Sequence, residues 1–282
     1  MKIKILQGDC IQSLKKLEDE SINTCITSPP YWGLRDYNGE EKQLGLEETP
    51  EEFVENFVNV FREVKRVLRD DGTVWLNLGD SFLPNKQLGC IPFKVAMALQ
   101  KDSWILRQDI IWHKPNCTPE SVKDRCTKAH EYIFLLSKNA KYYFDNEAIK
   151  EDAVAKNRSA GNKVPQKGTD QPFSETKQGL IKAQQKKYQK RNKRSVWTVT
   201  TKPFKGAHFA TFPMDLIEPC VLAGCPEGGT ILDPFAGSGT TGIVAANHAR
   251  NSVLLELNEE YIEIAKKRIK EQAGMFAKVY ED

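Results

Sequence analysis

The sequence contains no long run of apolar residues. Its apolar runs, such as Ile133–Leu136, are far shorter than the roughly 18 residues that a membrane-spanning helix needs. The first ten residues, MKIKILQGDC, also lack the apolar centre of a secretory signal. We therefore expect no membrane association and a cytoplasmic location.

Two common kinds of motif are also missing. The seven cysteines include no Cys-x-x-Cys pair, so the usual spacings of zinc sites and thioredoxin-like sites are absent. The sequence has no Gly-x-x-x-x-Gly-Lys motif, which argues against phosphoryl transfer on a P-loop. We therefore expect reduced, mostly buried thiols and no metal site.

Charge is distributed unevenly along the 282 residues. The net charge is +3, but residues 150–205 carry 15 Lys or Arg against 4 Asp or Glu, whereas the rest of the chain carries 26 against 34. Within that segment, Lys177–Arg194 has eight basic residues and no acidic one. Such a segment favours a polyanion as partner; the alternative is a solvated basic loop that binds nothing specifically.

Hydrophobic periodicity predicts strands alternating with helices on both sides of the basic segment. Thr49–Glu52 is a capping box with Pro50 at the first helical position, which marks the clearest helix start. The alternation predicts an α/β fold with an insertion at 139–200. The expected strands are Lys2–Leu6, Asn23–Thr27, Thr73–Leu78, Ile105–Trp112, Glu131–Ser137, Thr230–Leu232 and Ser252–Leu257, and the expected helices are Ile11–Leu17, Pro50–Leu68, Pro92–Gln100, Met214–Ala223, Thr240–Ala249 and Glu259–Gln272.

A glycine-rich turn separates the strand at 230–232 from the next helix. Gly237, Gly239 and Gly242 match the dinucleotide-binding fingerprint, and Glu256, nineteen residues after the first glycine, ends the following strand. Such glycines let a ligand approach backbone N–H groups at a helix N-terminus, and the carboxylate can accept hydrogen bonds from ribose hydroxyls. The turn predicts a nucleoside site, against the alternative of a glycine-capped helix start. Its position near the end of the chain implies a permuted motif order.

Two motifs carry a family resemblance. TSPPYW at 27–32 and DPFAGSG at 233–239 resemble the amino-methylating DNA methyltransferases, which transfer a methyl group from S-adenosylmethionine to the exocyclic nitrogen of cytosine or adenine. The motif order, with a basic insertion between, is similar to the β group of that family. The resemblance implies a Rossmann-like S-adenosylmethionine-dependent methyltransferase sheet of seven strands, with the strand at 131–137 antiparallel. It extends to GDC at 8–10, IWHKP at 111–115, HFATFP at 208–213 and ELN at 256–258.

The chemistry of the first motif can be argued from its residues. An exocyclic amino group is a poor nucleophile because its lone pair is delocalised into the ring. Ser28 Oγ and the Pro29 carbonyl can accept its hydrogen bonds and favour a pyramidal nitrogen, and the rigid turn through Pro30 fixes both acceptors. Tyr31 can stack on a base flipped out of the duplex. These four residues are the expected catalytic residues, with no covalent nucleophile.

The resemblance also implies how the cofactor is held. Asp9 is expected to contact the adenine amino group, Glu256 the ribose and Phe235 the length of the cofactor. Asp233 is expected to orient the methionine ammonium. The other residues with an implied cofactor-binding role are Gly237 and Gly239 beside the methionine end, Ser238 and Thr240 in the same turn, and His208 and Phe212 in a segment that closes over the cofactor.

Ser28 in place of an aspartate resembles the cytosine-N4 branch of the family, and the adenine-N6 branch is the alternative. The implied division of the chain is a catalytic half at 1–138, a basic target-recognition insertion at 139–200 and a cofactor-binding half at 201–282. The implied partners are double-stranded DNA and a companion restriction endonuclease. An RNA amino-methyltransferase and an NAD-dependent oxidoreductase are more distant alternatives, and the oxidoreductase has no use for residues 28–31. The expected DNA contacts are Lys186, Lys187, Lys190, Arg191 and Arg194.

Overall fold

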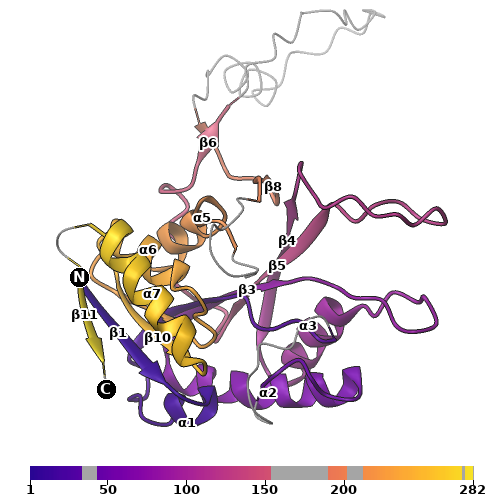
Figure 1. Cartoon of the computed structure of the whole chain (residues 1–282). Coiled ribbons are helices and arrows are strands. Elements are labelled where there is room, and N and C mark those ends of the chain that lie inside the picture. Colours follow the sequence, from indigo (N-terminus) through magenta and orange to yellow (C-terminus); the bar gives the residue numbers. More distant parts are fainter. Residues whose placement is uncertain (34–42, 154–189, 202–211, 275–276, 282) are drawn as a thin grey trace, which may run out of the picture. The chain divides into compact units, whose positions relative to one another are not determined.

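The computed structural model describes residues 1–33, 43–153, 190–201, 212–274 and 277–281 (Figure 1). The chain divides into two compact units, of which the first comprises Met1–Ala148 with Arg194–Asp282 and the second Ile149–Lys193. Among its described residues, the second unit contains the antiparallel pair β6 (Glu151–Asp152) and β7 (Lys190–Arg191). The second unit therefore spans fewer residues than the insertion expected at 139–200.

A nine-stranded sheet lies at the centre of the first unit, with the order β11-β1-β10-β9-β2-β3-β5-β4-β8 among the described residues. Neighbouring strands are parallel except β5, which is antiparallel to both β3 and β4. The α/β class and the antiparallel strand are thus confirmed, while β8 and β11 extend the seven strands expected. The strands are β1 (Lys2–Gln7), β2 (Ile22–Thr27), β3 (Leu68–Leu78), β4 (Ile105–His113), β5 (His130–Ser137), β8 (Val196–Thr198), β9 (Thr230–Asp233), β10 (Asn251–Glu256) and β11 (Lys278–Glu281).

Helices cover both faces of this sheet, with α1, α2 and α3 on one face and α5, α6 and α7 on the other (Figure 1). The predicted capping box starts α2: Thr49 Oγ1 accepts from the Glu52 backbone N–H at 3.2 Å, and Glu52 Oε2 accepts from the Thr49 N–H at 3.3 Å. The helices are α1 (Cys10–Leu14), α2 (Pro50–Val67), α3 (Ile91–Lys101), α5 (Met214–Gly224), α6 (Thr240–Asn247) and α7 (Glu259–Gln272).

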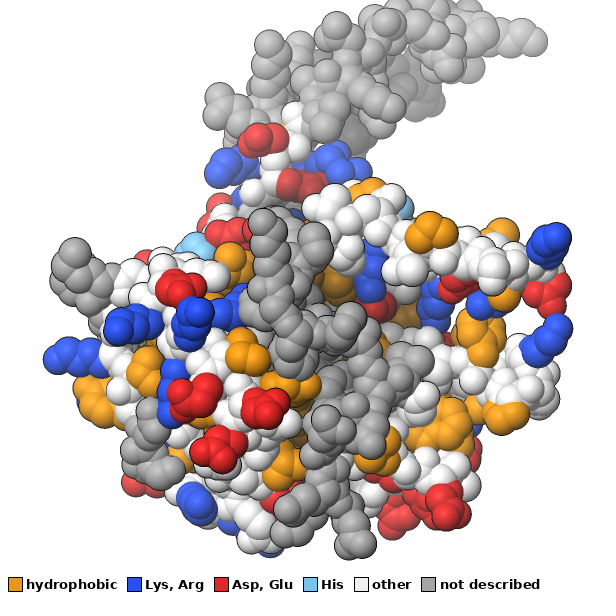
Figure 2. All heavy atoms as spheres, viewed as in Figure 1, with side chains coloured by type: hydrophobic (Ala, Val, Ile, Leu, Met, Phe, Trp, Pro, Cys, Tyr) orange, Lys and Arg blue, Asp and Glu red, His pale blue; other side chains and the backbone are white. Residues whose placement is uncertain are grey.

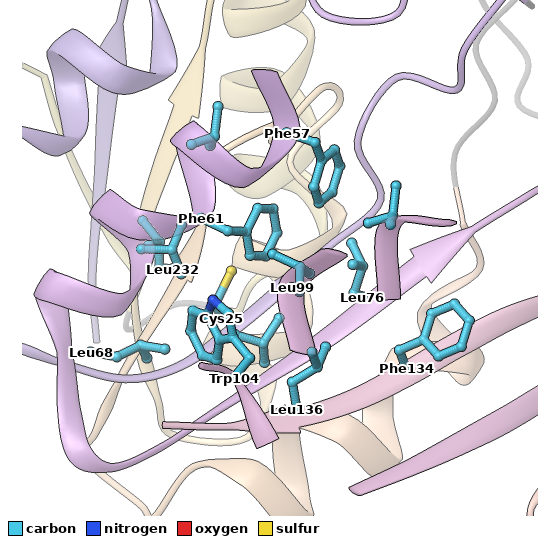
Figure 3. Packing of buried hydrophobic residues seen from close by; sticks show 14 of the residues in the cluster. Cys25, Phe57, Phe61, Leu68, Leu76, Leu99, Trp104, Phe134, Leu136 and Leu232 are labelled. Carbon is cyan, nitrogen blue, oxygen red and sulfur yellow. The ribbon is translucent and has the colours of Figure 1, made fainter. Parts of the chain in front are cut away.

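The largest core cluster packs α2 and α3 onto the sheet. Phe57 and Phe61 of α2 are fully buried with nearly parallel rings whose centroids lie 4.6 Å apart, and Trp104 meets Phe61 edge-on (Figure 3). Burying one such side chain stabilises the fold by about 1.5 to 3 kcal/mol. This packing anchors β2, β3 and β5, whose ends carry the catalytic motif and its neighbours.

Two expectations from the sequence are corrected by the structure. The strand expected at Thr73–Leu78 begins at Leu68 instead, so that Asp-Asp-Gly at 70–72, a sequence typical of turns, lies inside β3, which carries an irregularity where its pairing with β2 shifts register. All seven cysteines are free, as expected, but only Cys25, Cys220 and Cys225 are buried. The pairing of β3 with β2 on either side of the irregularity overrides the local turn signal of Asp-Asp-Gly.

On the face shown in Figure 2, Lys and Arg side chains are interspersed with Asp and Glu, so the described surface in this view has no extended patch of one charge. No helix in the described part of the chain combines the length and apolar character needed to cross a membrane. Across the same residues, no three His, Cys, Asp or Glu side chains gather as a metal site would require. Clustered basic charge is therefore a feature of the sequence at 177–194 that the described part of this face does not share.

Candidate active site

The two motifs meet at one edge of the sheet. Asp233 ends β9, Glu256 ends β10, Asp9 follows β1 and Ser28 follows β2, and all four strands are parallel. The carboxyl ends of parallel strands converge on a single edge, which is where open α/β sheets bind ligands. A pocket at this edge is lined by Gly8, Asp9, Cys10, Ser28, Pro30, Gln43, Leu44, Phe212, Pro234, Phe235, Ala236, Gly237, Ser238, Thr240, Leu255, Glu256, Leu257, Asn258 and Tyr261.

Glu256 is fixed at the glycine turn by backbone donors. Its Oε2 accepts from the Gly237 N–H at 2.7 Å and its Oε1 from the Asn258 N–H at 3.0 Å. Burial raises the pKa of this carboxyl above its ordinary value. Gly237 has φ +50°, and a Cβ added there would meet no atom within 4 Å. The pocket thus has open space beside a rigidly held carboxylate, as a nucleoside ligand requires.

Gly239 is the point at which the glycine turn meets α7. A Cβ at Gly239 would lie 2.9 Å from Ala265 Cβ and 3.3 Å from Ile269 Cδ1, both on α7. Its φ of +76° also disfavours any other residue. Among the described residues, the pocket lining includes Gly237 but not Gly239. The second glycine therefore lets α7 pack closely against the turn, and its expected place beside the methionine end of the cofactor stays a prediction.

Asp233 is enclosed by the protein instead of lining the pocket. Its side chain accepts hydrogen bonds from Thr27 Oγ1 at 2.7 Å, Thr241 Oγ1 at 2.6 Å and the Phe235 N–H at 3.1 Å. The residue is 1 % exposed, and burial raises the pKa of its carboxyl to about 6. Asp233 therefore ties the end of β2 to the glycine turn and α6, and the contact with a methionine ammonium expected for it stays a prediction.

Arg268 supports the same turn from α7. It donates to the Ser238 carbonyl at 2.7 Å and to Thr240 Oγ1 at 3.1 Å. Ser238 and Thr240 are two of the expected cofactor-binding residues, and both line the pocket. No sequence pattern singles out Arg268, because a basic residue on an amphipathic helix is usually solvated.

The catalytic motif leaves β2 directly at the pocket. Ser28 and Pro30 line it, while Pro29 is buried beneath. The Tyr31 ring lies against Gly79, where a Cβ would come within 2.5 Å of Tyr31 Cε2. Tyr31 Oη donates to Glu131 Oε2 at 2.8 Å. The ring is therefore held on both its face and its hydroxyl.

Three polar residues of this region were missed by sequence reasoning. Asn77 of β3 is 3 % exposed, and its Nδ2 lies 3.2 Å from Ser28 Oγ and 2.6 Å from Tyr31 Oη. Lys114 donates to Glu131 Oε1. The available signals were an asparagine inside the apolar strand VWLNL and a glutamate at the start of the apolar strand EYIFLL.

The other predicted residues lie in several places. Asp9 lines the pocket and caps α1, where its Oδ1 accepts from the Gln12 N–H at 2.9 Å. Phe212 and Phe235 also line it. The expected DNA contacts Lys190 and Arg191 belong to the second unit, in which Arg191 pairs with Glu151 at 2.9 Å. Arg194 is exposed in the first unit. The residues His208, Lys186 and Lys187 lie outside the described residues.

A family model for N6 and N4 methylation, described as DNA methylase, matches residues 22–267. The chain belongs to this DNA methylase family. It is 43 % identical to the Type II methyltransferase M.SmaI of Serratia marcescens, over 94 % of this chain and 90 % of the relative. It is 42 % identical to the Type II methyltransferase M.Cfr9I of Citrobacter freundii, over 94 % and 87 %. The resemblance drawn from residues 27–32 and 233–239 is confirmed.

Solved structures share the fold of this methylase. The PvuII DNA methyltransferase, which is cytosine-N4-specific, superposes with a TM-score of 0.71 at 20 % identity, covering 95 % of this chain and 87 % of that one. A Thermus thermophilus protein complexed with S-adenosyl-L-methionine gives a TM-score of 0.65 at 24 % identity, covering 99 % of both chains. The Rossmann-like methyltransferase fold expected from the sequence is confirmed.

Proposed function

We propose that this methylase transfers a methyl group from S-adenosylmethionine to the exocyclic N4 of a cytosine flipped out of duplex DNA. The observation that carries the proposal is that Ser28 and Pro30 of the catalytic motif line the same pocket as Phe235, Gly237 and Glu256. An amino nitrogen held at Ser28 and Pro30 would therefore face a nucleoside cofactor held at Phe235, Gly237 and Glu256. A DNA substrate also implies a cytoplasmic location.

The pocket residues fit S-adenosylmethionine. Glu256, held by the Gly237 and Asn258 N–H groups, is suited to the ribose hydroxyls, and Asp9 beside it is suited to the adenine amino group. The open space at Gly237 leaves room for the methionine portion. When bound, the cofactor supplies an electrophilic methyl group on a sulfonium sulfur. The protein's own task is to present the amino nitrogen to it.

The catalytic motif fits an amino group. Ser28 Oγ and the Pro29 carbonyl can accept hydrogen bonds from an amino group, and the transfer needs no covalent nucleophile. Ser28 in place of an aspartate resembles the cytosine-N4 branch of the family, which favours the cytosine amino group as the target. The same acceptors can also serve N6 of adenine, so the identity of the base is the first thing to measure.

The test is transfer of labelled methyl groups to mixed-sequence duplex DNA, followed by digestion to nucleosides and mass spectrometry. We expect labelled N4-methylcytosine from the wild type, none from Tyr31→Ala, and wild-type amounts from Tyr280→Ala, which removes an exposed tyrosine on β11. If the labelled product is N6-methyladenine instead, the target base is adenine rather than cytosine and the proposed mechanism is unchanged. Methylation of RNA in preference to DNA would refute the assignment of the substrate.

We further propose that the basic segment including Ile149–Lys193 contacts the DNA target. Its lysines supply phosphate contacts, and its Gln and Asn side chains supply candidates for base contacts. Replacing Lys186, Lys187 and Lys190 by glutamine should weaken binding to all sequences and flatten the salt dependence by about 0.9 for each phosphate that is no longer neutralised. The same change at Lys101, Lys267 and Lys270, exposed on α3 and α7, is the control. An unchanged salt slope in the first variant would refute the proposal.

The Type II relatives also support a role in restriction and modification. In such a role, methylation protects the host sequence from a companion endonuclease. Expression of the methylase should then make host DNA resistant to an endonuclease that cuts the methylated sequence. Digestion of that DNA at an unprotected rate would refute this part of the proposal.

A further inference from the structure

A chain of hydrogen bonds leads from the catalytic serine into the protein. Ser28 Oγ lies 3.4 Å from Tyr31 Oη, and Tyr31 Oη lies 2.8 Å from Glu131 Oε2. The other carboxylate oxygen, Oε1, accepts from Lys114. The chain joins the loop after β2 to the first residues of the antiparallel strand β5, across 100 residues of sequence. It starts at the pocket, because Ser28 lines it.

The partners set the direction of every bond in this chain. An ionised carboxylate only accepts, so the Tyr31 hydroxyl donates to Glu131. Once the Tyr31 proton is used in this way, its oxygen accepts from the Ser28 hydroxyl. Asn77 reinforces the direction, because its Nδ2 lies 2.6 Å from Tyr31 Oη and 3.1 Å from Glu131 Oε2 and donates to oxygen. Ser28 Oγ also accepts from Asn77 Nδ2 at 3.2 Å, so its second lone pair is left for an amino hydrogen in the pocket.

The surroundings keep the chain in this state. The Glu131 and Lys114 side chains are 16 % and 18 % exposed and form a direct ion pair. Lys114 also lies over the Trp112 ring, 4.2 Å from its centroid. The close fit of the Tyr31 ring on Gly79 leaves little freedom for its hydroxyl to turn away.

We propose that this chain removes the proton released by methylation and delivers it to Glu131. The inference rests on the proposed function. As the bond from the amino nitrogen to the methyl carbon forms, the carbon–sulfur bond breaks and its electron pair stays on sulfur, so the nitrogen becomes cationic. That nitrogen loses a proton to Ser28 Oγ, the Ser28 proton passes to Tyr31 Oη, and the Tyr31 proton passes to Glu131 Oε2. The carboxylic acid formed returns its proton to solvent after product release.

Glu131 does not touch the base in this scheme, so it is a positioning and proton-accepting residue that acts through Tyr31. A merely structural role would lower the rate without changing its dependence on pH. A proton-accepting role also makes the rate fall in acid as Glu131 becomes protonated, and this acid limb disappears when Glu131 is replaced. The pH profile therefore separates the two roles.

The experiment compares single-turnover methylation of duplex DNA by wild type, Glu131→Gln, Tyr31→Phe and the double variant across a pH series. Loss of a positioned acid–base group costs about 10²- to 10⁴-fold in rate, and we expect this range for each single variant. We expect the double variant to be no slower than the slower single one, since both changes break one chain. Glu63→Gln, which removes a partly buried carboxylate paired with Arg66 and distant in sequence from the motif, is the matched control and should keep the wild-type rate.

A measurement on the cofactor-free protein checks the chain without relying on activity. In carbon-13 NMR of protein labelled at tyrosine Cζ, the signal missing in Tyr31→Phe belongs to Tyr31, and it should shift in Glu131→Gln but not in Glu63→Gln. Circular dichroism shows whether each variant is folded. If Glu131→Gln does not fold, Tyr31→Phe, which keeps the aromatic ring, still tests the chain.

Three results would overturn the relay: a Tyr31→Phe rate within about threefold of wild type, losses that multiply in the double variant, or an acid limb that persists in Glu131→Gln. In each of these cases the wild type still methylates DNA, so only the relay fails. A wild type that methylates no base overturns the proposed function, and the relay with it.

Discussion

Replacing Asp233 by asparagine tests how the two motifs are held together. Burial raises the pKa of Asp233 from its ordinary value of 3.8 to about 6, so the folded protein binds this proton more tightly than the unfolded chain. The associated stability is fully present below the unfolded value and is lost as the pH rises through about 6. The difference between the two pKa values corresponds to about 3 kcal/mol in the free energy of unfolding.

Asparagine has the same shape and no charge. Its carbonyl oxygen can accept from Thr27 and from the Phe235 N–H, and its amide can donate to the Thr241 hydroxyl, so the three links are retained. The free energy of unfolding of Asp233→Asn, relative to wild type, should therefore rise by roughly 1 to 2 kcal/mol between about pH 5 and about pH 8. The variant is relatively more stable at the higher pH because it has no carboxylate to ionise.

The assay is urea unfolding at several pH values, followed by tryptophan fluorescence, with Asp145→Asn at a half-buried aspartate as the control. Taking the difference between variant and wild type cancels the titration of all other groups. A difference that does not change with pH, or one that falls as pH rises, would refute the link between burial of Asp233 and its pKa. Loss of unfolding cooperativity in the variant would show instead that the charge itself is needed to hold Thr27 and Thr241.

Two further substitutions test the glycine turn. Gly239→Ala should lower the free energy of unfolding by roughly 2 to 4 kcal/mol, because the added Cβ would overlap Ala265 at a positive φ. Gly237→Ala also has a positive φ but has open space around it, so it should lower the free energy of unfolding by only about 1 to 2 kcal/mol. Equal losses in urea unfolding would contradict this difference. Arg268→Ala should lower S-adenosylmethionine affinity by about tenfold in calorimetric titration, since Ser238 and Thr240 lose their common donor, while the exposed Lys267→Ala should not; unchanged affinity would show that the turn is rigid without Arg268.

Local patterns were sufficient for most of the fold. The capping box at Thr49 located the start of α2, and apolar alternation located each strand of the sheet core to within a few residues, except at β3. These signals succeed because they depend on backbone hydrogen bonds and burial periods within a few residues. The early start of β3 was missed because pairing with β2 overrides a local turn signal.

Some residues of the candidate site could likewise be predicted from local sequence, whereas others depended on the tertiary structure. Ser28, Pro30, Gly237 and Glu256, which line one pocket, could be singled out because acceptors on a proline turn and glycines before a helix are recognisable from adjacent residues. The role of Glu131 required the tertiary structure, since it reaches Tyr31 only because β5 runs antiparallel beside β3 and brings its first residues to the carboxyl end of that strand.

Within the motif at 233–239, the contacts of Asp233 and Gly239 also depend on the tertiary structure. The sequence marks both as part of a ligand-binding turn, yet one is enclosed by two threonines and the other faces α7. Residue type limits which bonds a position can form. The packing of distant helices and strands decides which of those bonds form, because the neighbours of a buried group come from whichever segments the strand order places beside it.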